Sequence, residues 1–200
     1  DRSFFLQGDI DRFAGLRTSL DDALRDQRLQ PAFDLFNVYV QRVAERTAYA
    51  RKALKRDFDF SRDESYVYER KEAPWATSAD ELDELWRQRV KNDVLRLKLA
   101  GKELPAIRST LDKRYANFEE RVREINSEDL FQTFMNAYAS SIEPHTAYMN
   151  PRTTENFNIS MRLSLEGIGA VLQRDDDEMT VIRTIVPGGP DTDDLLLIPG

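Results

Sequence analysis

Residues 31–54 read PAFDLFNVYVQRVAERTAYARKAL. Apolar side chains recur in this stretch every three or four residues, which places them along one side of an α-helix. They are Phe33, Phe36, Tyr39, Val40, Val43, Thr47, Ala50 and Leu54. Pro31 suits the first turn of a helix, where an N–H group is not needed. The stretch therefore predicts a long amphipathic helix from residue 31 to about residue 58.

The same spacing predicts four further helices. Ser78 and Glu81 form a capping box that opens one of them, and Gly101 is a natural stop for it. Another begins near residue 104, and Asn126 or Ser127 caps the last. Their apolar positions are Leu16, Leu20, Ala23 and Leu24; Leu82, Leu85, Trp86, Val90, Val94 and Leu97; Ile107, Leu111, Tyr115, Phe118, Val122 and Ile125; and Leu130, Phe131, Phe134 and Tyr138.

Two parts of the chain break this helical pattern. Between residues 57 and 75 the period is lost, which predicts an ordered loop with a possible short strand. From Leu163 onward, glycine and β-branched residues predict two strands, at 167–172 and 180–182, around an acidic turn. The residues that remain are too few to close a sheet, so the chain looks truncated. We expect a mainly α-helical domain at 1–150, then a connecting segment and a partial β module at 151–200.

Composition excludes several classes of protein. The formal charge is −7 and basic residues alternate with acidic ones, which argues against a nucleic-acid-binding face. Without cysteine there is neither a disulfide nor a thiolate zinc site, and a single histidine, His145, argues against a metal centre. No apolar run is long enough to span a membrane. No signal-peptide leader precedes Asp1, so it is absent or was removed.

The sequence offers one candidate binding element and no catalytic one. Gly167 and Gly169 stand one residue apart before a predicted strand, where successive N–H groups can converge on a peptide's terminal carboxylate. Local sequence alone favours the alternative, a glycine-rich turn without a ligand. His145 fits a helix-terminating turn, because no nucleophile stands on a constrained turn such as Gly-x-Ser-x-Gly. No cofactor is implied.

Several segments together resemble one family. Glu143-Pro144-His145-Thr146, Asn150-Pro151-Arg152 and the stretch at 163–170 follow the order found in C-terminal processing peptidases, where a helical domain leads into a PDZ domain. Upstream, residues 5–10 and 72–76 are similar to the long-form tail-specific proteases. The resemblance covers essentially the whole chain. It departs at Glu143, where the family usually has Asp.

The resemblance implies a periplasmic serine endopeptidase of a Gram-negative envelope. It would recognise protein substrates by an apolar, unstructured C-terminus, and a tetratricopeptide-repeat lipoprotein adaptor is a possible partner. The catalytic serine and lysine of such proteases lie beyond the PDZ domain, so this chain should be inactive alone. The implied peptide-binding residues are Gly167, Ile168, Gly169, Ala170, Val171 and Leu172. The alternative is a non-enzymatic helical module that docks an adaptor or self-associates.

Overall fold

The computed structural model describes residues 2–161, 170–174 and 180–185. These residues are mainly helical and end in a two-stranded sheet, as the sequence predicts. The elements are helices α1 (Gln7–Arg12), η1 (Ala14–Thr18), α2 (Leu20–Arg25), α3 (Gln30–Ala53), α4 (Ala79–Leu99), α5 (Leu104–Arg123), α6 (Ser127–Ile142) and α7 (Pro151–Met161), and strands β1 (Ala170–Arg174) and β2 (Thr180–Ile185).

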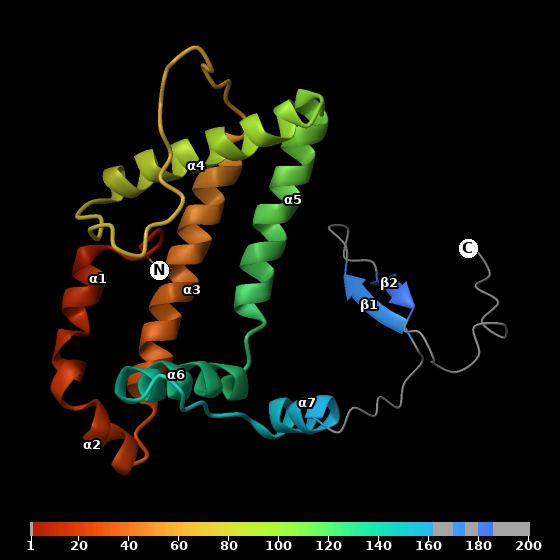
Figure 1. Cartoon of the computed structure of the whole chain (residues 1–200). Coiled ribbons are helices and arrows are strands. Elements are labelled where there is room, and N and C mark those ends of the chain that lie inside the picture. The colour runs from red at the N-terminus through yellow and green to blue at the C-terminus, as the bar shows by residue number, and fades with distance from the viewer. Residues whose placement is uncertain (1, 162–169, 175–179, 186–200) are drawn as a thin grey trace.

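The core lies between the three longest helices. In Figure 1, α3 and α5 stand side by side, α4 crosses them at one end, and α6 lies across the other. The predicted apolar stripes of α3, α4 and α5 supply most of this core, where Val43, Val90, Ile107 and Leu111 are fully buried. Burying one such side chain contributes about 1.5–3 kcal/mol, so the three stripes together hold the helices in place.

Local capping chemistry sets the helix ends. The Ser78 hydroxyl accepts a hydrogen bond from the Glu81 N–H at 3.2 Å, but the Glu81 carboxylate accepts from Thr77 N at 2.7 Å, one residue before the usual capping-box partner. Gly101 ends α4 with φ of +81°, a conformation that favours glycine. Of the two predicted caps for α6, Asn126 is the one used.

The N-terminal segment is part of the core. Phe4 is buried among Tyr39, Trp86 and Phe118, with ring centroids 5.3–5.8 Å from its own. The Trp86 indole N–H donates to the Ser3 carbonyl at 2.6 Å. These contacts attach the N-terminal segment that leads into the short helices α1, η1 and α2 to the core. The sequence predicted a helix only in the later part of this region, from about Leu16 to Leu24.

Helix α7 was not predicted, because the sequence reading placed only a connecting segment there. The buried Asn150 caps it, accepting from Thr153 N at 2.8 Å, while the Asn150 N–H donates to Gln132 of α6 at 2.8 Å. Tyr148 N also donates to Asn136 of α6 at 2.7 Å. Two amide side chains thus tie the segment before α7 to α6.

Strands β1 and β2 pair antiparallel, as predicted. Ala170 lies opposite Ile185 and Arg174 opposite Thr180, with an irregularity between Val171 and Leu172. The acidic turn between the strands lies outside the described residues. By contrast, no strand forms at residues 66–68, and the stretch after α3 is a loop, which agrees with the principal reading of the sequence.

Candidate functional site

The expected peptide-binding residues are described only in part. Ala170, Val171 and Leu172 lie in β1, whereas Gly167, Ile168 and Gly169 lie outside the described residues. Val171 and Leu172 are 46% and 50% exposed. Within the described residues β1 pairs only with β2. The described part of the candidate site is therefore a strand with exposed apolar side chains.

His145 lies in a turn that follows α6. Its N–H donates to the Glu143 carboxylate at 3.0 Å, which also accepts from the Thr146 hydroxyl at 2.8 Å. The imidazole is exposed, which agrees with a structural turn. The described ranges contain no group of three potential metal-ligating side chains, and none of their helices is long and apolar enough to cross a membrane.

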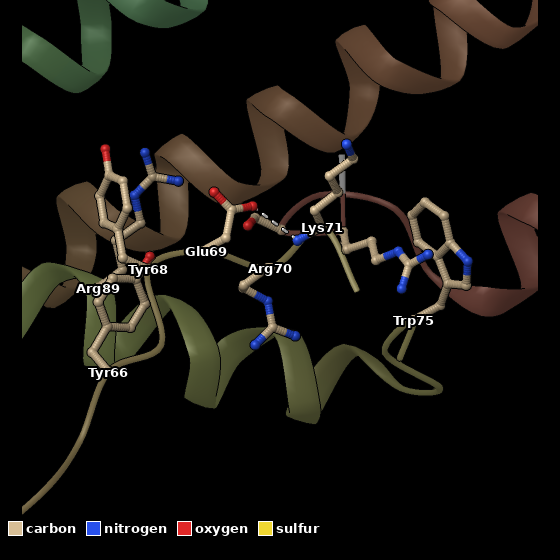
Figure 2. Close-up of a pocket in the computed structure, with 9 residues that line it drawn as sticks. Tyr66, Tyr68, Glu69, Arg70, Lys71, Trp75 and Arg89 are labelled. Carbon is tan, nitrogen blue, oxygen red and sulfur yellow. Dashed lines mark hydrogen bonds between the residues drawn. The ribbon is translucent and has the colours of Figure 1, made fainter. Parts of the chain in front are cut away.

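A second candidate site is a pocket of about 500 Å³ that three distant segments form. We call it the cationic groove. The N-terminal segment, the loop between α3 and α4, and α4 itself all contribute to it. Its lining residues are Arg2, Ser3, Tyr66, Tyr68, Glu69, Arg70, Lys71, Trp75 and Arg89. Figure 2 shows Tyr66, Tyr68 and Arg89 at one end of the groove, Trp75 at the other, and Arg70 between them.

The Trp75 end of the groove is fixed by contacts between the loop and the N-terminus. Arg2 donates a hydrogen bond to the Ala73 carbonyl, and its guanidinium lies 5.1 Å from the centre of the Trp75 ring. Further along both segments, Gln7 N donates to the Ala76 carbonyl at 2.8 Å. The loop between α3 and α4 and the N-terminal segment therefore together form one wall of the cationic groove.

Aromatic side chains shape the other end. Tyr66 and Tyr68 meet edge to face at 6.3 Å. Burial raises the pKa of Tyr66, so its phenol stays neutral. Arg89 lies over the Trp86 ring at 4.5 Å in a cation–π contact, and it forms no ion pair with a carboxylate in the described part of the chain.

The groove carries an excess of positive charge. It contains four basic side chains and one acidic one, Glu69, whose carboxylate accepts from the N–H of Lys71 at 3.2 Å. None of the four cations forms an ion pair with a carboxylate of the described residues, although many other arginines do. The Nε of Arg70 is buried and has no hydrogen-bond partner there.

Sequence reasoning did not find this groove. Its cations lie far apart in the chain and follow no periodic pattern, so no local signal unites them. The nearest hint in the sequence is Tyr66-Val67-Tyr68, which by itself predicts only an ordered loop with a possible short strand.

These observations define a mainly helical protein in which a two-stranded antiparallel sheet follows the helices, with two candidate binding surfaces among the described residues. The family model of the tail-specific protease N-terminal domain matches residues 1–152. A tail-specific protease of Haemophilus influenzae is 39% identical over 197 residues, which cover 98% of this chain and 28% of that protein. The chain belongs to the tail-specific protease family, as its sequence resemblance indicated. It spans just over a quarter of that relative's length.

Proposed function

We propose that the complete protein is a periplasmic serine endopeptidase that selects envelope proteins by their apolar C-terminal tails. The observation that supports this most is the exposed strand β1, which directly follows a Gly-x-Gly segment in a member of this family. The helical part, residues 1–150, would hold the β module at 151–200, which we take as the start of a PDZ domain.

Tail binding would combine two kinds of contact. The N–H groups of Ile168, Gly169 and Ala170 would receive the terminal carboxylate, and Gly167 would allow the chain to turn there. The tail would then add to the edge of β1 as an extra strand, beside Val171 and Leu172. Backbone pairing supplies affinity in this mode, and the side-chain contacts supply the preference for apolar tails.

Cleavage would use residues outside this chain. A serine becomes a nucleophile when a neighbouring base takes its proton, and a desolvated lysine is neutral enough to do so. The chain of 200 residues should therefore be inactive as a protease on its own.

The test is a degradation assay with the full-length protein. Two versions of one loosely folded substrate differ only in the last residues, which are apolar in one and charged in the other. The apolar version should disappear faster by at least about tenfold, a difference of about 1.4 kcal/mol in transition-state binding. Equal rates for the two versions would refute tail selection.

A further inference from the structure

We propose that the cationic groove binds an extended acidic segment of a partner protein. The inference concerns a site other than β1 and does not depend on tail recognition. It rests on three features of the groove within the described residues: cations that form no ion pair, a stretch of backbone that forms no backbone hydrogen bond, and aromatic walls between the charges.

The charges of the groove are unusual for this molecule. The chain carries a net charge of −7, and its other partly buried arginines meet acids, as Arg42 meets Asp9 at 2.8 Å and Arg87 meets Glu64 at 2.8 Å. In the groove, Arg2, Arg70, Lys71 and Arg89 surround one cavity without such partners in the described part of the chain. Like charges held close together repel, and a bound anion relieves that cost.

The backbone beside these cations is free to pair. Residues 62–69 form no backbone-to-backbone hydrogen bond with another described residue. This stretch also exposes Val67 and Tyr68, by 58% and 79%. An extended peptide could take up these N–H and C=O groups by forming a strand alongside them.

The stretch is anchored at both ends, which makes it a preformed platform. At its start, the Glu64 carboxylate accepts from Lys91 at 2.5 Å and from Arg87 at 2.8 Å, both on α4. Shortly after its end, Arg2 donates a hydrogen bond to the Ala73 carbonyl. A fixed binding surface loses little conformational entropy when a ligand arrives, so modest contacts suffice.

The layout favours a peptide over a phosphate group. In Figure 2, Arg89 lies at one end of the groove and Arg70 nearer the middle, so the charges follow one another along the groove. Acidic side chains spaced along a strand can reach both, with the rings of Tyr68 and Trp75 packing against the residues between them. A nucleic acid is disfavoured, because beyond the groove its backbone would meet an acidic protein.

The probe is a fluorescein-labelled decapeptide that alternates Glu with Leu and ends in an amide, so that it has no tail carboxylate. Its control replaces each Glu with Gln. Fluorescence anisotropy with the 200-residue chain should detect the acidic peptide and not its neutral control. Binding should weaken several-fold between about 50 and 300 mM NaCl, because salt screens exposed charges.

Matched variants locate the site. Arg70→Gln with Lys71→Gln removes two groove charges and should weaken binding by about tenfold or more. Lys52→Gln with Lys55→Gln removes two exposed charges of α3 and the turn after it, and should change binding less than about twofold. Tyr68→Ser changes a side chain that is 79% exposed, so it should weaken binding without lowering the melting temperature.

Three outcomes would overturn the proposal. Equal binding of the Glu and Gln peptides would show that charge does not matter. Equal losses in the two double variants would show that only net charge matters. If inorganic phosphate alone binds and displaces the peptide in a one-to-one manner, the groove is an anion site and not a peptide site.

Discussion

Ile107 gives the sharpest test of the packing described above. Its side chain is fully buried on α5, in the cluster that joins α3, α4 and α5. Ile107→Ala removes three carbons, and at about 0.8 kcal/mol for each the loss of transfer free energy is about 2.4 kcal/mol. The cavity left behind adds to this, which gives a total of about 2.5–5 kcal/mol. Because Ile107 belongs to a cluster that α3, α4 and α5 share, its loss should destabilise the packing of all three helices.

The assay is urea unfolding followed by far-UV circular dichroism, with the free energy of unfolding extrapolated to water. The matched control is Ile142→Ala, the same deletion at the end of α6, where the side chain is 69% exposed. It should cost less than about 0.5 kcal/mol. If Ile107→Ala costs under about 1 kcal/mol, or if both variants cost the same, the arrangement of the three helices is wrong.

Three further predictions follow from single contacts. Asn126→Ala removes the cap of α6 and should lower the free energy of unfolding by about 1 kcal/mol in a urea titration. Gly101→Ala places a side chain at φ of +81° in open space, so it should destabilise by about 1 kcal/mol from backbone strain alone. Hydrogen bonds from Lys91 and Arg87 lower the pKa of Glu64 to about 2 from 4.5, so this stabilisation is complete above pH 4.5 and is lost as pH falls toward 2. Glu64→Gln should therefore show a smaller loss of stability than the wild type across that window, measured as melting temperature against pH.

The long helices could be read from the sequence because one side of each is buried. Val90 and Val94 on α4, and Ile107 and Leu111 on α5, repeat at helical spacing, and every one of them is buried. The order of a helical body before a β-hairpin was also predictable, because residue types change sharply after Leu163.

The short helices were harder to read, because tertiary contacts stabilise them more than their own sequence does. At α7, Asn150 followed by Pro151 is a possible cap and first turn, but the same pair is also typical of a simple turn. The hydrogen bond between Asn150 N and Gln132 decides between the two, and its partners lie 18 positions apart.

The cationic groove could not be predicted for the same reason. Arg2, Arg70 and Arg89 come together only because the loop after α3 folds back against the N-terminal segment and α4. In the sequence, no motif or spacing marks any of these three arginines as a binding residue. What distinguishes them is that none forms an ion pair with a carboxylate of the described residues, which no local pattern reveals.

The central claim, recognition of a free C-terminus by a protease, has one direct test. The full-length protein is given a single substrate with an apolar tail, prepared with either a free carboxylate or a C-terminal amide. The account predicts that the amide form is degraded more slowly by about tenfold or more, because the N–H groups proposed to receive the tail, those of Ile168, Gly169 and Ala170, would lose their charged acceptor. Equal degradation of the two forms would contradict tail recognition. That result would not bear on the separate proposal that the cationic groove binds an acidic peptide.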